Sequence, residues 1–169
     1  VGGDNMDLAL AYAVAQQMTA DGKKLDSWQM RALWHTCRSA KEQILASSGS
    51  ETIPISVLGR GSGLIGGTLR TELTRDIVEQ AIVEGFFPFC ESDARPAAVP
   101  RSGIQETGLA YEADPAVTRH LARFLSRNED RPQEMPTAVL FNGGVMKSRL
   151  LQERVTEVLG SWQTDSQLR

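Results

Sequence analysis

The stretch TAVLFNGGVMKSRLL, residues 137–151, carries the strongest fold signal in this chain of 169 residues. The run Thr137–Phe141 is typical of a strand buried in a parallel sheet, and apolar periodicity predicts a helix over about Lys147–Leu159. Between them, Gly143 and Gly144 let a ligand approach the backbone closely, and the first N–H groups of the helix attract anions. The junction therefore predicts a ligand site, with a plain tight turn as the alternative.

A second junction of the same form opens the chain. Residues 2–5, GGDN, lead into a predicted helix over about 6–19, with Asp4 or Asn5 as its cap. Two Gly-Gly junctions in one chain favour a phosphate-bearing ligand. The sequence starts at Val1 without an initiator Met, so we expect it to be a piece of a longer protein.

The next predicted helix, about 28–46, begins at a capping box formed by Asp26 and Gln29. One of its faces is apolar, and the opposite face carries charged side chains that include Arg38 and Lys41. Taken alone, these two cations fit a solvated helix face as well as a ligand site.

Two strands are predicted after this helix. Alternation over 52–57 indicates the first, and Pro54 makes it an edge strand because proline cannot donate a ladder hydrogen bond. A hairpin turn over 59–63 leads to the second strand at about 64–73, in which Gly66-Gly67 suggests a bulge. Thr74 then caps a helix that is expected to reach about residue 83 and to end at Gly85.

The remainder of the chain starts with a stretch without periodicity. Residues 91–113 are rich in Pro, Gly, Ser and Ala, which predicts a long functional or linking loop. Asp114 is expected to cap another helix, with Pro115 in its first turn, and this helix reaches about Ser126. The predicted order is therefore helix, helix, strand, strand, helix, loop, helix, strand, helix. This order predicts a fold of the mixed α+β class. Its last three elements, a helix, a strand and a helix, form a unit of the α/β type.

The composition excludes several classes of protein. With 41% hydrophobic and 23% charged residues and a net charge of -3, the chain has ordinary globular usage. It has no basic block and no apolar run near ~20 residues, so we expect neither nucleic acid nor a membrane as partner. Cys37 and Cys90 are too few for a disulfide scaffold and indicate free thiols in a reducing cytoplasm.

No catalytic or metal site can be assembled from the residue pattern. His35 and His120 lie on predicted helices and have no carboxylate or cysteine at ligand spacing. The Gly-x-Ser-x-Gly motif of a nucleophile elbow is absent, and the acidic residues stand at helix starts, where capping explains them. We therefore expect no catalytic residue and no metal ligand in this chain.

Four segments resemble DnaK-type heat-shock chaperones, which belong to the actin-like ATPase superfamily. Residues 2–7, GGDNMD, are similar to the family's Gly-Gly-Glu-Asp-Phe-Asp, and 33–41, LWHTCRSAK, to its helix ending in Cys-Glu-x-Ala-Lys. Residues 69–79, LRTELTRDIVE, resemble Ser-Ile-Thr-Arg-x-x-Phe-Glu, and 137–151 resemble the strand and adenosine loop Val-Leu-Val-Gly-Gly-Ser-x-Arg. The segments stand in the family's order and cover most of the chain outside 91–113. The amino-acid sequences of these segments suggest a divergent bacterial branch of the family.

The resemblance implies the second lobe of an actin-like ATPase domain, with ATP or ADP as its ligand. Residues 1–90 are then the outer subdomain, 91–113 an inserted loop, and 114–169 part of the inner subdomain with the adenosine loop. In the family, the helix that corresponds to residues 28–46 faces adenine and ribose from one side, and the adenosine loop meets them from the other side. The opening glycines are expected to approach the phosphates. The binding residues so implied are Gly3, Arg38, Lys41, Gly143, Gly144, Val145 and Lys147.

The sequence departs from the family at the adenine contacts. Arg38 stands where the family has Glu, and Glu42 where it has an Arg that stacks on adenine. Lys147 replaces the stacking Arg of the adenosine loop, and Val145 replaces a Ser. The family's phosphate loop, catalytic Lys and Mg-associated Asp precede the part that this chain resembles. The resemblance therefore implies Mg²⁺ in the full-length protein, with its ligands outside this chain.

Two other interpretations stay open. In the family, nucleotide-exchange factors bind the outer subdomain. The first of these interpretations is therefore that the chain is an interaction module for such a factor or for a co-chaperone. A sugar kinase of the actin-like group shares the adenosine loop, although CRSAK at 37–41 and LTRDIVE at 73–79 favour the chaperone type.

Overall fold

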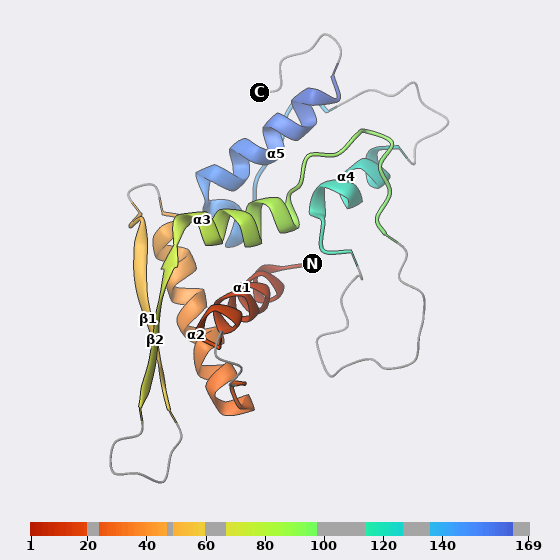
Figure 1. Ribbon diagram of the computed structural model, residues 1–169. Coiled ribbons are helices and arrows are strands. Elements are labelled where there is room, and N and C mark those ends of the chain that lie inside the picture. Colours follow the sequence, from red (N-terminus) through yellow and green to blue (C-terminus); the bar gives the residue numbers. More distant parts are fainter. Residues whose placement is uncertain (20–23, 47–48, 60–66, 98–113, 127–135, 164–169) are drawn as a thin grey trace.

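The computed structural model describes residues 1–19, 24–46, 49–59, 67–97, 114–126 and 136–163. Within these ranges, five α-helices and a two-stranded antiparallel sheet form a mixed α+β fold (Figure 1), which confirms the coarse class predicted from the sequence. The elements, in chain order, are α1 (Gly3–Met18), α2 (Ser27–Ile44), β1 (Thr52–Leu58), β2 (Thr68–Thr74), α3 (Arg75–Val78), the π-helical η1 (Glu79–Glu84), α4 (Val117–Leu125), the 3-10 turn η2 (Val145–Lys147) and α5 (Arg149–Ser161).

The first two helices begin at capping boxes. The N-cap of α1 is Gly2, so the prediction of Asp4 or Asn5 as cap is wrong; Asn5 Oδ1 instead accepts a hydrogen bond from the Gly2 amide at 3.0 Å. In α2 the predicted box is confirmed, because Asp26 Oδ1 accepts from the Gln29 amide at 2.8 Å and Gln29 Oε1 accepts from the Asp26 amide at 3.0 Å.

The strands pair one to one from Thr52 opposite Thr74 to Leu58 opposite Thr68, so this stretch contains no bulge. The sheet that the structure describes has two strands, and each is therefore an edge that can hold a proline such as Pro54. The predicted turn over 59–63 and the Gly66 bulge position fall almost wholly outside the described residues. The second strand begins at Thr68, later than the predicted residue 64.

Hydrogen bonds at the two ends of α2 fix it to β1 and to the first residue of α3. Gln29 Nε2 donates to the Leu58 carbonyl at 3.0 Å near the start of the helix. At the other end the Arg75 guanidinium donates to the Ile44 carbonyl at 3.0 Å, which satisfies one of the terminal carbonyls that lack a partner within the helix. The charged face of α2 is thereby held in one orientation.

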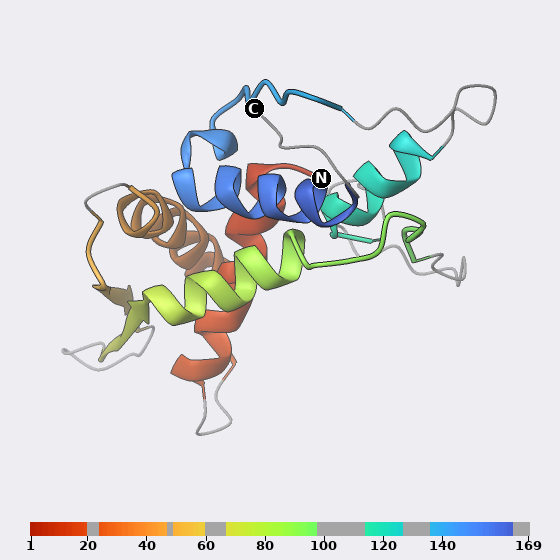
Figure 2. The ribbon, with the colours of Figure 1, turned by 90° about the horizontal axis from the view of Figure 1, so that it is seen from above.

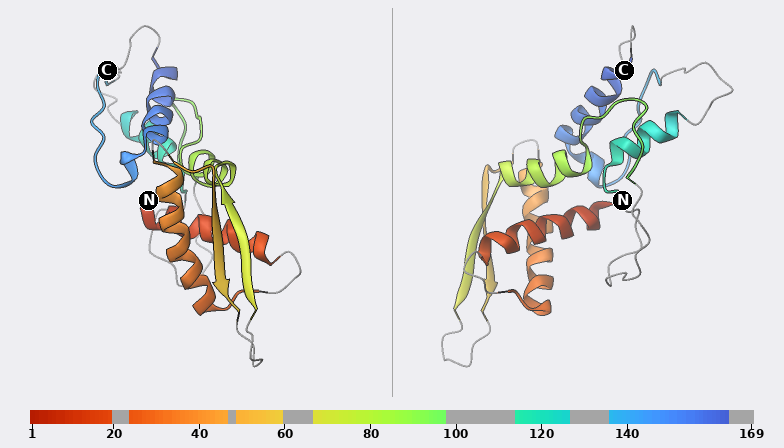
Figure 3. Two further views of the ribbon diagram at one scale, coloured as in Figure 1. Left: turned by 90° about the vertical axis from the view of Figure 1, so that its left-hand side faces the viewer. Right: turned by 45° about the vertical axis from the view of Figure 1, so that its right-hand side comes forward.

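The helix after the sheet is longer and less regular than predicted. Thr74 caps it as expected, because its Oγ1 accepts from the Ile77 amide at 3.4 Å. The helix then passes into η1, and helical backbone continues through Gly85 instead of ending there. π-Helical turns are rare in proteins overall, but those that occur are often found at functional sites. Figure 3 shows α3 and η1 running above α1, with the β1–β2 ribbon along α2.

The last helix, α5, lies alongside η1 (Figure 2). Arg154 on α5 forms an ion pair with Glu84 at 2.6 Å, donates to the Phe87 carbonyl at 3.2 Å and places its guanidinium 4.7 Å from the centre of the Phe89 ring. The helices and the sheet share one apolar core, whose largest fully buried side chains include Leu10, Leu33, Ile44, Ile55, Leu73, Ile82, Phe87, Leu151 and Leu159.

The predicted strand Thr137–Phe141 is wrong for the chain as the structure describes it. These residues have no strand partner, and the Leu140 side chain is 95% exposed. A parallel strand needs hydrogen bonds to a neighbouring strand, and the described ranges hold no strand besides β1 and β2. The end of the chain is therefore a helix, an extended segment and a helix.

A buried carboxylate joins residue 97 to the start of α4. Asp114 was predicted as a helix cap, but the N-cap of α4 is Ala116. The Asp114 carboxylate accepts hydrogen bonds from the Ala97 amide at 2.7 Å, the Ala116 amide at 2.9 Å and the Arg119 guanidinium at 2.8 Å. Of the predicted loop 91–113, residues 91–97 are irregular and the rest lies outside the described residues.

Replacing Asp114 with Ala is expected to lower the free energy of unfolding by about 2–3 kcal/mol at pH 7, because three donors lose their acceptor. Burial acts to raise the pKa of Asp114, but the Ala97 and Ala116 amides and the Arg119 guanidinium together hold that pKa below its usual range. This stabilisation is present above the unfolded-state pKa of about 3.9 and is lost as the pH falls through the folded-state pKa. Urea denaturation from pH 7 to pH 2 measures both effects.

The exposed Asp93 provides the matched control, and Asp93→Ala is expected to change stability by less than about 0.5 kcal/mol. A parent and an Asp114→Ala variant that differ equally at pH 7 and at pH 2 would contradict the assignment.

Candidate functional site

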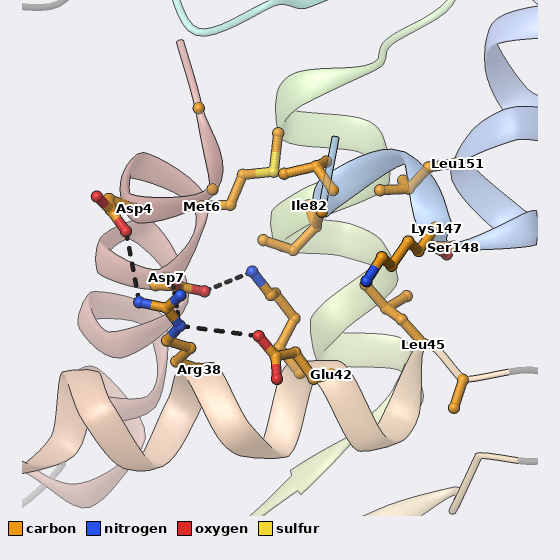
Figure 4. Close-up of a pocket in the computed structure, with 16 residues that line it drawn as sticks. Asp4, Met6, Asp7, Arg38, Glu42, Leu45, Ile82, Lys147, Ser148 and Leu151 are labelled. Atoms are coloured by element: carbon orange, nitrogen blue, oxygen red, sulfur yellow. Dashed lines mark ion pairs between the residues drawn. The ribbon is translucent and has the colours of Figure 1, made fainter. Parts of the chain in front are cut away.

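A cavity of about 730 Å³ lies between the start of α1, the charged face of α2, η1 and the segment that leads into α5 (Figure 4). Six of the seven residues singled out from the sequence line it, although they come from three distant segments. These residues are Gly3, Arg38, Lys41, Gly144, Val145 and Lys147.

The seventh residue, Gly143, does not line the cavity but shapes the turn beside it. Its φ is +93°, a left-handed conformation that favours glycine. Gly144 has an ordinary φ of -63°, and a Cβ added there would meet no atom within 4 Å. The two glycines therefore have different roles. Gly143 adopts the backbone conformation that the turn requires, and the absence of a side chain at Gly144 leaves space in the cavity.

The two Gly-Gly junctions meet at one edge of the cavity. A Cβ added to Gly3 would lie 3.3 Å from Val145 Cγ2, so the start of α1 packs closely against η2. A side chain at position 3 would require the Val145 side chain to shift by a few tenths of an ångström. This contact brings together the opening of the chain and the junction more than a hundred residues later.

A buried ion pair crosses the floor of the cavity between α1 and α2. Lys41 Nζ lies 2.5 Å from Asp7 Oδ1, and the side chains are 10% and 2% exposed. No hydrogen-bond donor other than this ammonium reaches that oxygen in the described chain. Lys41 therefore does not lie on a solvated helix face, which was one of the two interpretations of the sequence.

Arg38 stands among three carboxylates at the same end of the cavity. Its guanidinium nitrogens lie 3.8 Å from Asp4, 4.0 Å from Asp7 and 3.7 Å from Glu42. These distances are long for ion pairs, and the Arg38 side chain is 58% exposed. The guanidinium is held by charge alone and can move toward a ligand at low cost.

The opposite end of the cavity is mainly apolar. Leu45, Ile82 and Leu151 line it. Figure 4 shows Leu45 and Leu151 on the side of Lys147, away from Asp4 and Arg38, with Ile82 between them and Met6. Within the described ranges, Lys147 forms no ion pair, so its charge is available to a ligand. Ser148 is buried at the N-cap of α5.

This arrangement suits a ligand with two unlike ends. A flat, weakly polar group fits between the apolar side chains, and hydroxyl or anionic groups fit at the charged end and at the first amides of α1. The cavity carries equal numbers of cationic and anionic side chains, namely Arg38, Lys41 and Lys147 against Asp4, Asp7 and Glu42. A bare anion therefore has no overall excess of positive charge to bind.

Sequence reasoning did not single out Asp7, Ile82 or Ser148. A signal for Asp7 exists, because it shares the i, i+3, i+7 face of α1 with Leu10 and Val14 and must therefore be buried. A carboxylate on a buried face requires a cation, and Lys41 supplies it. Ile82 depends on the π-helical turn, which the sequence does not predict.

Comparison of the chain with protein-family models, curated proteins and solved structures gave no match. Within the described ranges, no helix combines the length and apolar composition needed to cross a membrane. The same ranges hold no group of three or more His, Cys, Asp or Glu side chains placed to bind a metal ion.

Proposed function

We propose that this chain is part of the second lobe of a DnaK-like, actin-like ATPase and that its cavity binds ATP or ADP. One observation carries the proposal. The residues that the resemblance assigns to nucleotide binding lie in three segments around residues 3, 38–41 and 144–147, and all but Gly143 line a single cavity. Unrelated surface residues from such distant segments would not be expected to converge.

The chemistry of the cavity supports a nucleotide. Its volume of about 730 Å³ lies within the 300–1,000 Å³ that is typical of ligand pockets. The base fits the apolar end beside Lys147, and the ribose hydroxyls can bond to the Glu42 carboxylate and the cations of α2. The phosphates then extend toward Gly2 and Gly3, whose positions at the start of α1 favour anions. Mg²⁺ accompanies the phosphates, and we assign its ligands to other parts of the full-length protein.

The proposal also accounts for the extended segment Thr137–Phe141. Its alternate residues Val139 and Phe141 pack against the core, while Leu140 is almost fully exposed. In an intact actin-like lobe this segment becomes a strand of a larger sheet, which buries Leu140 and satisfies the backbone. The apolar composition of the segment supports this part of the proposal.

The chain by itself is expected to bind ATP with a Kd of ~0.1 mM or weaker and to show no ATPase activity. An actin-like site is built from both lobes, and even two missing charged hydrogen bonds cost orders of magnitude in affinity. Phosphoryl transfer needs phosphates, metal and water positioned together. Equilibrium titration and a phosphate-release assay measure the two quantities.

A micromolar Kd would contradict the expectation on affinity, because this lobe would then carry most of the binding energy. Turnover that persists through repurification and disappears in a cavity variant such as Gly144→Val would contradict the expectation on activity.

A second candidate function is an interaction module for a nucleotide-exchange factor or co-chaperone. The exposed aromatic side chains Tyr12 and Trp28, at 54% and 47%, favour it, since aromatic residues are enriched at protein interfaces. Tyr12 also lines a smaller hollow between α1 and α2, of about 440 Å³. If this is the main function, Tyr12→Ala weakens binding of the partner and Gly144→Val does not.

A further inference from the structure

Arg154 joins α5 to the end of η1 by three contacts. Its guanidinium forms an ion pair with Glu84 at 2.6 Å and donates a hydrogen bond to the Phe87 carbonyl at 3.2 Å. The same guanidinium lies 4.7 Å from the centre of the Phe89 ring, and the Arg154 side chain is only 16% exposed. The planar fork of an arginine donates in fixed directions, so three partners on one segment hold α5 in a defined position against η1 (Figure 2).

The Phe87 carbonyl lies directly after the helical stretch that contains η1, which ends at residue 86. The last carbonyls of a helix have no partner within the helix, and a cation at that end interacts favourably with the helix dipole. Arg154 therefore holds the C-terminal end of this π-helical stretch from outside, with a charge and a hydrogen bond.

The two elements that Arg154 joins also form the apolar end of the cavity. Ile82 lies in η1, two residues before Glu84, and Leu151 lies on α5, three residues before Arg154. Residues three apart lie on the same side of a helix, so Leu151 and Arg154 are neighbours on α5. Ile82 and Leu151 are fully buried in one core, but apolar packing is not directional and by itself does not fix their spacing.

We propose that Arg154 is a positioning residue of this cavity, which sets the spacing of Ile82 and Leu151 at the end where the base fits. Arg154 does not line the cavity and acts only through these two walls. The inference rests on the proposed function for its effect on the nucleotide, whereas its effect on the walls exists without ligand. A gap of about 0.5–1 Å already forfeits a quarter to a half of the attraction between two contacting atoms.

The first part of the test needs no ligand and compares methyl NMR spectra of the parent and of Arg154→Met. Methionine keeps the apolar stem of the side chain and removes the guanidinium. The methyl resonances of Ile82 and Leu151 are expected to shift, because the two walls move relative to each other. The methyl resonances of Ile55, on β1, are expected to stay in place.

The second part measures the affinities for adenosine and ATP by chemical-shift titration into the millimolar range. Arg154→Met is expected to weaken both by the same factor, about three- to tenfold, because displaced walls lose contacts with the base. Adenosine is uncharged, so the loss of a distant cation does not weaken it through charge. Arg154→Lys keeps the charge without the planar fork and is expected to lie between the parent and Arg154→Met.

Two variants provide matched controls. Arg149 lies on the same helix and pairs with Glu153 at 2.7 Å within α5, so Arg149→Met is expected to keep the methyl spectrum and the affinity for adenosine. Asp114→Ala is expected to lower stability at a site outside the cavity and to keep the affinity for adenosine as well. The second control separates a loss of stability from a displaced cavity wall.

The outcomes separate the inference from the proposed function. If the parent binds neither adenosine nor ATP, the proposed function is overturned and the methyl spectra alone decide the inference. Resonances of Ile82 and Leu151 that stay in place in Arg154→Met overturn the inference, whether or not a nucleotide binds. Equal affinity of Arg154→Met and the parent for the probe that the parent binds, or an equal loss in Asp114→Ala, also overturns it. If Arg154→Met does not fold, Arg154→Lys decides by the same criteria.

Discussion

Gly144→Val is expected to abolish detectable nucleotide binding while the protein melts at the temperature of the parent. The backbone of Gly144 has an ordinary φ of -63°, so valine adopts it without strain. A Cβ at this position meets no atom within 4 Å, because the space beside it belongs to the cavity. The valine side chain therefore occupies the volume that the nucleotide needs. Titration with ATP and thermal unfolding measure the two halves of the prediction.

Valine substitutions at two other glycines serve as comparisons for Gly144→Val. Gly160 lies on α5, also has open space around an added Cβ and is outside the cavity, so Gly160→Val is expected to keep the affinity of the parent. Gly143→Val is expected to lose ~1–3 kcal/mol of stability, because its φ is +93°. If Gly144→Val binds ATP like the parent, the assignment of the adenosine loop is wrong and the interaction module becomes the better account.

Lys41→Met is expected to have the largest effect on stability, a loss of about 3–5 kcal/mol. The substitution leaves the Asp7 carboxylate, 2% exposed, without the ammonium that lies 2.5 Å from it. Breaking one side of a buried ion pair leaves an uncompensated charge in the interior. The double variant Asp7→Leu with Lys41→Met removes both charges and is expected to recover most of the loss. Urea denaturation of the four proteins in this cycle measures the coupling.

Arg38→Met serves as the control for charge near Asp7. Arg38 is 58% exposed and lies 3.7–4.0 Å from its carboxylates, so its replacement is expected to cost less than about 1 kcal/mol. Equal losses for Lys41→Met and Arg38→Met would show that the ion pair does not stabilise the fold. Lys41 would then be free to bind a ligand directly, as the resemblance implies.

Local signals predicted most of the elements correctly. The capping box of Asp26 and Gln29 and the cap at Thr74 depend on residues three positions apart, and both are confirmed. The first strand followed from alternation within seven residues, and the second from the hairpin turn predicted before it. These features are encoded within one or two turns of chain, so sequence alone is sufficient to find them.

Features that depend on distant partners were not predictable in this way. Thr137–Phe141 has a strand composition, but a strand forms only where another strand pairs with it. Lys41 could not be assigned to the surface or to the cavity until Asp7, on another helix, was placed beside it. The convergence of Gly3 on Val145 and the unpaired hydroxyl of Ser148 are likewise products of packing.

The central claim, that this cavity binds a nucleotide, is tested most directly by titrating the isotope-labelled chain with ATP and following every backbone amide by NMR. The account predicts saturable shifts at submillimolar to millimolar ATP that cluster at Gly3, Lys41, Gly144 and Lys147, around the 730 Å³ cavity. Shifts that cluster instead at Tyr12 and Trp34 around the smaller hollow, or no saturable shift at 10 mM ATP (about -2.7 kcal/mol or weaker), would contradict it.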